Sequence, residues 1–194
     1  MWTIIKKEVK SYFLSPIAYI FIGLFLFMNS IFFYLDVYAI GRVNFEYMFG
    51  SLATVLTFAV PILTMRMFAE ERKNGTEQIL YTSPRSITSI VLGKFLAATI
   101  IMVICEVFTL MYLGILKYFG QPHISTALVT LLGFLLLSMA YIAFGMFASS
   151  ITENQIIAGV ITIAGLLVIW FMPSFYSSLS NFSLINVFSN TQKT

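Results

Sequence analysis

The stretch EERKNGTEQILYTSP, residues 70–84, is the longest strongly polar segment of a chain that is otherwise very hydrophobic. It contains Asn74-Gly75, which favours the end of a helix, and Ser83-Pro84, which favours the start of one. Between them lies the apolar triplet Ile79-Leu80-Tyr81. Long apolar runs flank the stretch on both sides, so it predicts a structured loop between two helices that cross a membrane.

The composition supports a membrane protein. Of the 194 residues, 59% are hydrophobic and 10% are charged, with a mean hydropathy of +0.93, whereas soluble domains carry roughly 25% charged residues. The net charge of +3 comes from eleven Lys and Arg residues, and their position at helix ends explains the excess better than a nucleic-acid partner does. The single cysteine, Cys105, lies in an apolar run and cannot form an intrachain disulfide.

Five apolar segments are long enough to cross a bilayer as helices. We expect the spans at residues 16–35, 47–65, 95–116, 124–151 and 155–172, the last ending before Pro173. The predicted fold is therefore an all-α polytopic membrane domain covering residues 1–194, with a loop at 66–94. The serine-rich segment 173–194 is too polar for another span, and we expect it outside the membrane.

The cations indicate the orientation. Three lysines near the N-terminus and five cations in the loop 66–94 lie on one side, against Arg42 and Lys117 on the other. The positive-inside rule therefore predicts a multi-pass protein of the cell membrane with a cytoplasmic N-terminus.

The first fifteen residues form a separate pattern. On a helical projection one arc contains the residues Trp2, Ile5, Val9, Tyr12 and Phe13. The three lysines fall outside this arc, and Ile4 is an exception to the pattern. This predicts an amphipathic helix in the cytoplasmic interface. The alternative is a simple extension of the first span.

The loop has the signals of three helical pieces. We expect the helix of the second span to continue through residues 66–73 and to stop at Asn74-Gly75. A short helix at 77–81 follows, with Thr76 as its cap, and a third helix starts at Ser83-Pro84 and runs into the third span. By periodicity alone, the apolar triplet could contact a soluble partner or lie on the lipid headgroups.

Residues 69–94, AEERKNGTEQILYTSPRSITSIVLGK, resemble the corresponding loop of ABC-2 type permeases, the membrane subunits of a class of ATP-binding-cassette exporters. The family pattern has the form E-x-R-x-x-G-T-x-E/Q-L-L-x-x-x-P followed by Gly-Lys. The residues that carry the resemblance are Glu70, Glu71, Arg72, Gly75, Thr76, Glu77, Leu80, Pro84, Gly93 and Lys94. The span spacing and the amphipathic N-terminus agree, so the similarity covers nearly the whole chain.

The resemblance implies a permease that couples ATP hydrolysis on a partner to export. It implies cytoplasmic ABC ATPase subunits as partners, a second identical or related permease subunit, and a coupling helix that contacts the ATPase. The implied coupling residues are Glu70, Glu71, Arg72, Gly75, Thr76, Glu77, Ile79, Leu80 and Tyr81. The family usually has six spans and this sequence shows five, so we expect a six-helix fold that lacks its last helix.

The chain has no nucleotide site of its own, because a P-loop around Gly93-Lys94 would need Gly and Ser or Thr where Thr88 and Phe95 stand. ATP and magnesium are therefore expected on the partner ATPase, with no cofactor on this chain. The single histidine, His123, offers neither a metal-site spacing nor a catalytic dyad. We expect no metal site and no enzymatic activity of the chain itself.

Two features lie within the spans. Glu106 falls near the middle of the third span, where a charge costs about 2.5–3.5 kcal/mol; it could line a translocation path or be a neutral side chain hydrogen-bonded to a neighbouring helix. Gly145 and Ser149 form a small-x-x-x-small pair, which favours close packing within the subunit over a dimer contact. The rival functions are a motor-independent channel or secondary transporter, and a non-transporting membrane anchor for an ATPase.

Overall fold

The computed structural model describes residues 2–36, 45–75, 86–119 and 123–181. In these ranges the chain is helical, with α1 (Trp2–Leu14), α2 (Pro16–Tyr34), α3 (Phe45–Thr64), α4 (Ala69–Lys73), α6 (Ile87–Phe119), α7 (Ile124–Ile151) and α8 (Gln155–Asn181). Among the described residues, five helices are long and apolar enough to cross a membrane. The all-α polytopic prediction is confirmed.

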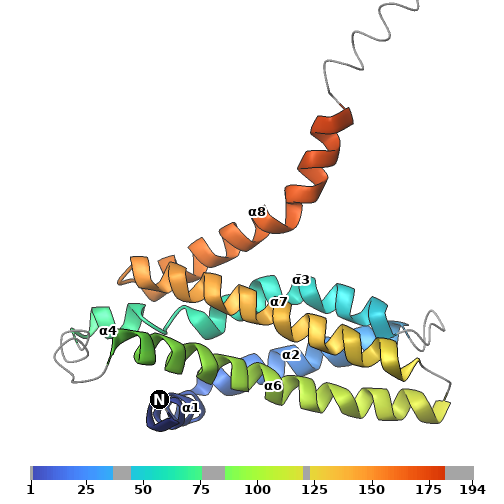
Figure 1. The fold of residues 1–194 in the computed structure, drawn as a ribbon, viewed down its shortest axis with the longest axis horizontal. Coiled ribbons are helices and arrows are strands. Elements are labelled where there is room, and N and C mark those ends of the chain that lie inside the picture. The colour runs from blue at the N-terminus through green and yellow to red at the C-terminus, as the bar shows by residue number, and fades with distance from the viewer. Residues whose placement is uncertain (1, 37–44, 76–85, 120–122, 182–194) are drawn as a thin grey trace, which may run out of the picture.

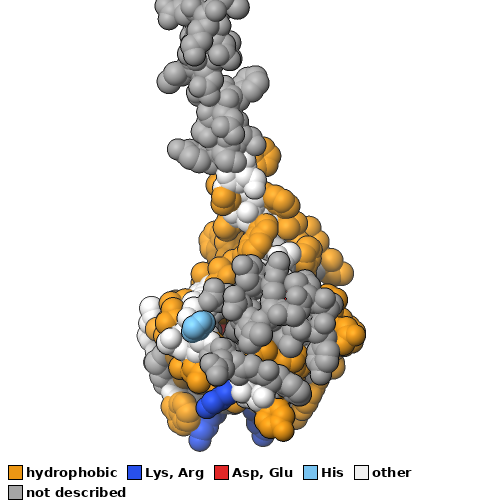
Figure 2. Space-filling model, turned by 90° about the vertical axis from the view of Figure 1, so that its right-hand side faces the viewer, with side chains coloured by type: hydrophobic (Ala, Val, Ile, Leu, Met, Phe, Trp, Pro, Cys, Tyr) orange, Lys and Arg blue, Asp and Glu red, His pale blue; other side chains and the backbone are white. Residues whose placement is uncertain are grey.

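Four of the long helices form a bundle. Figure 1 shows α2, α3, α6 and α7 side by side, with α1 viewed nearly along its axis at one edge. The bundle core consists of large side chains that are fully excluded from solvent, among them Phe21, Phe25, Leu56, Ile101 and Ile142. Many large hydrophobic side chains are exposed, and they form most of the coloured surface on the face shown in Figure 2, as expected for helices that face lipid.

Glycines allow two pairs of helices to approach closely. A Cβ at Gly145 of α7 would lie 2.2 Å from Thr64 Oγ1 of α3, and one at Gly165 of α8 would lie 2.3 Å from the Phe144 ring of α7. Contacts this short require the absence of a side chain. The predicted packing of Gly145 within the subunit is therefore confirmed.

The first helix is distinct from the first span. Ser15 separates α1 from α2, its Oγ accepts a hydrogen bond from the Ile17 amide at 3.3 Å, and Pro16 occupies the first position of α2. The alternative that residues 1–15 simply extend the span is therefore wrong. Ile4, the exception in the sequence pattern, packs on Gly93 of α6, where a Cβ would lie 2.6 Å from Ile4 Cγ2.

Two predicted helix boundaries are wrong. The helix of the second span does not continue unbroken through residues 66–73, because turns at 65–68 separate α3 from α4. The last span does not end before Pro173, because α8 continues to Asn181 with Pro173 inside it. Proline removes one backbone hydrogen bond and bends a helix without necessarily ending it, and Figure 1 shows α8 bending away from the bundle.

Candidate functional site

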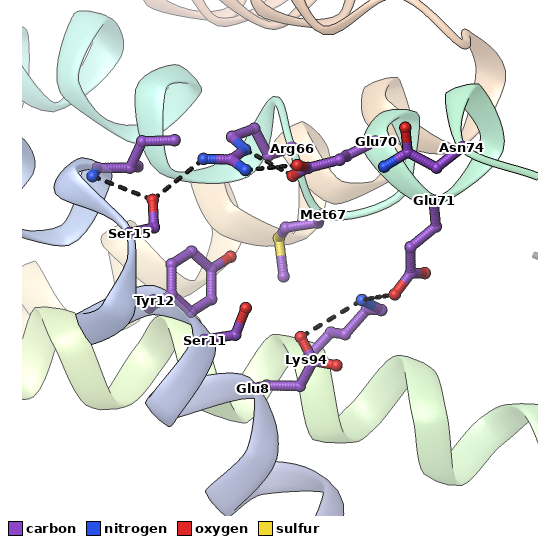
Figure 3. Close-up of a pocket in the computed structure, with 11 residues that line it drawn as sticks. Glu8, Ser11, Tyr12, Ser15, Arg66, Met67, Glu70, Glu71, Asn74 and Lys94 are labelled. Atoms are coloured by element: carbon purple, nitrogen blue, oxygen red, sulfur yellow. Dashed lines mark hydrogen bonds and ion pairs between the residues drawn. The ribbon is translucent and has the colours of Figure 1, made fainter. Parts of the chain in front are cut away.

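The predicted loop begins on a polar cavity of about 240 Å³ between α1, α4 and α6 (Figure 3). We call the residues around it the loop base. They are Glu8, Ser11, Tyr12, Ser15, Ile17, Arg66, Met67, Glu70, Glu71, Asn74 and Lys94.

Lys94 joins three helices at the loop base. Its Nζ lies 2.7 Å from Glu71 Oε1 of α4 and 3.4 Å from Glu8 Oε2 of α1, and its side chain is only 4% exposed. The Phe68 ring centroid is 5.5 Å from the same ammonium group, within the range of a cation–π contact. A buried ammonium group is costly without partners, so these contacts fix the relative positions of α1, α4 and α6.

A second ion pair lies beside the first. Arg66 donates from Nε to Glu70 Oε2 at 2.6 Å and from Nη2 to Glu70 Oε1, which makes a bidentate pair. Arg66 Nη1 also donates to Ser15 Oγ at 3.0 Å. The turn after α3 is thereby linked to the corner between α1 and α2.

Two hydroxyl groups hydrogen-bond to the backbone around the break between α3 and α4. Tyr12 donates to the carbonyl of Leu63 at 3.2 Å, near the end of α3, where helical carbonyls lose their partners. Burial, and then the nearby charge of Glu8, raise the pKa of the Tyr12 phenol above its ordinary value, so the phenol remains a donor.

The other hydroxyl comes from α7. Ser149 Oγ accepts from the amides of Phe68 and Ala69, both at 3.1 Å, and donates to the carbonyl of Met65 at 3.2 Å. Since Phe68 is the cap of α4 and makes no side-chain cap bond, Ser149 supplies from another helix what a cap residue usually supplies locally.

The structure describes four of the nine predicted coupling residues. Glu70 and Glu71 point into the loop base, Arg72 lies in the last turn of α4, and Gly75 follows α4 with a φ of +68°. The predicted stop at Asn74-Gly75 is confirmed, because Asn74 caps α4 and Gly75 takes the left-handed conformation. Thr76, Glu77, Ile79, Leu80 and Tyr81, with the predicted short helix at 77–81 and the Ser83-Pro84 start, lie outside the described residues.

Glu106 lies within α6, apart from the loop base. It is 8% exposed, and its Oε1 has no hydrogen-bond partner in the described part of the chain. Nearby on the same helix, Thr109 accepts a hydrogen bond from Asn29 Nδ2 of α2 at 2.7 Å. Glu106 and Thr109 therefore place two buried polar side chains of α6, three positions apart, inside the apolar bundle.

Sequence reasoning missed several members of the loop base. Glu8, Tyr12, Ser15 and Arg66 were not predicted to belong to the site, and Lys94, although part of the family pattern and of the cation count, was not predicted to pair with Glu8 or Glu71. Arg66 and Glu70 have the i, i+4 spacing of an ion pair, which was an available signal. No local signal connects Glu8 with Lys94, because they are 86 positions apart.

The comparisons with known proteins agree with the resemblance seen in the loop. Residues 38–192 match the family described as ABC-2 family transporter protein, which is most of the chain. Comparisons with curated proteins and with solved structures gave no match. On the evidence of this match and of five apolar helices able to span a membrane, the chain belongs to the ABC-2 family of transporter proteins and is a transmembrane permease domain.

Proposed function

We propose that this chain is the membrane subunit of an ATP-driven exporter. In this proposal cytoplasmic ABC ATPase subunits bind ATP and magnesium and contact residues 76–81, and a second permease subunit, identical or related, completes the pathway. The excess of cations in the N-terminus and in the loop 66–94 supports a cytoplasmic position for both segments in the cell membrane.

The observation that carries the proposal is the fixation of the loop base. Residues 76–85 connect α4 to α6, and Lys94 holds both helices against Glu8 of α1. Ser149 and Arg66 fix the other side of α4 to α7 and to the α1–α2 corner. A displacement applied to residues 76–81 would therefore move several helices together, as coupling to a motor requires.

Glu106 is the residue that we propose for the translocation path. A carboxyl oxygen that is buried in a span without a described partner is costly. A protein tolerates the free-energy cost of this buried carboxyl group more easily where water or a substrate reaches the group in another conformation.

The test is affinity purification of the tagged protein from its native membrane, followed by identification of bound proteins. The variant carries Glu77→Arg and Leu80→Asp. A matched control carries Asp36→Arg and Leu35→Asp, which likewise replaces one acidic residue by arginine and one leucine by aspartate, at the other end of the first span. We expect a P-loop ATPase to co-purify with the native protein and with the control. It should be absent when the loop variant is purified.

If no ATPase is recovered with a folded native protein, the proposal fails and a motor-independent transporter becomes the better explanation. If the ATPase is retained by the loop variant, it binds elsewhere and residues 76–81 are not the coupling element.

A further inference from the structure

The helix α1 has two faces with different environments. Its inner face contacts the bundle through Ile5, which is buried, and through the Glu8 carboxylate on Lys94. Its outer face carries three exposed lysines and two exposed apolar side chains, namely Lys6, Lys7, Lys10, Trp2 and Leu14. The inner contacts fix the rotation of the helix, so the outer face is presented in one orientation.

The orientation of α1 places all of its outer face at a similar depth relative to the bilayer. In Figure 1 the long helices of the bundle lie in the plane of the view, whereas α1 is seen nearly end-on. Because α2 starts immediately after Ser15, α1 lies across the start of the first span. Its exposed side chains therefore lie at the level of the headgroups of one leaflet.

The lysines of the outer face are available for an external partner. Within the described residues, no ion pair or hydrogen bond joins Lys7 or Lys10 to another side chain, and Lys6 Nζ lies 5.5 Å from the Trp2 ring centroid.

The chemistry of this face fits an anionic lipid surface better than a soluble protein. Three ammonium groups complement phosphodiester headgroups, and each adds about fivefold to the attraction near an anionic leaflet. Trp2 is 66% exposed and Leu14 is 76% exposed, at the two ends of the helix. An indole and an aliphatic side chain beside lysines match the boundary between headgroups and acyl chains.

We propose that the lysine face of α1 binds anionic phospholipid headgroups. The bound leaflet holds α1 in place, and the Glu8–Lys94–Glu71 contacts connect α1 to α4 and α6. Given the exporter proposal above, the headgroup charge of the leaflet thus acts on the positions of α4 and α6, which flank the residues proposed to contact the ATPase.

The test uses the fluorescence of Trp2 in the full chain carrying Trp170→Phe, which leaves one of the two tryptophans. The protein is reconstituted in vesicles of one part phosphatidylglycerol to three parts phosphatidylcholine. In a first set of vesicles only the phosphatidylglycerol is brominated, so that it quenches tryptophan fluorescence. A second set has the same fraction of brominated phosphatidylcholine. We expect stronger quenching by brominated phosphatidylglycerol, and a loss of the difference at about 1 M salt, where the Debye length is about 3 Å.

The variant is Lys6→Gln with Lys7→Gln and Lys10→Gln, and the control is Lys117→Gln at the other end of α6. In the triple variant both brominated lipids should quench Trp2 equally. In the control, brominated phosphatidylglycerol should still quench Trp2 more strongly than brominated phosphatidylcholine. Equal quenching in the native protein, or an unchanged preference in the triple variant, overturns the proposal. Quenching by neither lipid also overturns it, since Trp2 would then be covered by protein. The assay needs no ATPase, so its result is separate from that of the exporter proposal.

Discussion

Replacing Lys94 by methionine is expected to destabilise the protein strongly. Methionine keeps most of the side-chain volume, but it removes the ammonium group that lies 2.7 Å from Glu71 and 3.4 Å from Glu8. The Glu8 and Glu71 carboxylates would then share a confined space without the Lys94 ammonium group that lies between them. Removal of one partner of a buried ion pair costs about 3–5 kcal/mol.

The expected cost here is smaller, because the partners are not fully buried. The side chains of Glu8 and Glu71 are 16% and 24% exposed, so water recovers part of their solvation. We therefore expect a loss of about 2–3 kcal/mol. With a shift of about 2–4 °C per kcal/mol for a chain of this size, the unfolding midpoint should fall by about 4–12 °C.

The assay is thermal unfolding in lipid nanodiscs, followed by circular dichroism at a fixed scan rate. The control is the neutral triple variant Lys94→Met, Glu8→Gln and Glu71→Gln. This variant removes the charges of Lys94, Glu8 and Glu71 together, so it should regain stability to within about 1 kcal/mol of the native protein. A single variant as stable as the native protein, or a triple variant less stable than the single one, would refute the electrostatic role assigned to Lys94.

Three further predictions address the remaining contacts. Ser149→Ala removes the acceptor for the Phe68 and Ala69 amides and should lower the stability of this contact by about 1–3 kcal/mol. Amide exchange at 68–69 should become faster. The control Ser150→Ala loses only a hydrogen bond within α7 and should leave that exchange unchanged. Gly93→Val should displace α1, because a Cβ at position 93 would lie 2.6 Å from Ile4 Cγ2, and amide exchange in α1 should become faster. Adding Ile4→Ala to the same chain should restore slow amide exchange in α1. Glu106→Gln should alter substrate-stimulated ATPase activity of the assembled transporter, and unchanged activity at normal expression counts against a role in the path.

Most of the fold could be predicted from the sequence. The fourth span was predicted at 124–151 and α7 is Ile124–Ile151, because an uncharged apolar run bounded by polar turns has few alternatives in a membrane. The break between α3 and α4 could not be predicted, since residues 66–73 favour a helix locally. It is stabilised by Ser149, which is about 80 positions away in the chain.

The site was less predictable than the fold. The loop and the helix stop at Asn74-Gly75 followed from local signals, and the spacing of Arg66 and Glu70 also offered one, but the Lys94 partner of Glu71, 23 positions away, did not. The Glu8–Lys94 contact depends on the approach of α1 to α6 at Gly93, and a helical projection of residues 1–15 contains no information about that approach. The close packing at Gly93 also explains why Ile4 departs from the amphipathic pattern.

The central claim is that a cytoplasmic ATPase contacts residues 76–81 of this chain. The most direct measurement is photo-crosslinking in intact cells, with p-benzoylphenylalanine placed at Leu80 in one strain and at Leu35, at the other end of the first span, in a second strain. The account predicts a covalent adduct with a P-loop ATPase from position 80 and none from position 35. Adducts with lipid alone at position 80, or equal adducts at both positions, would contradict it.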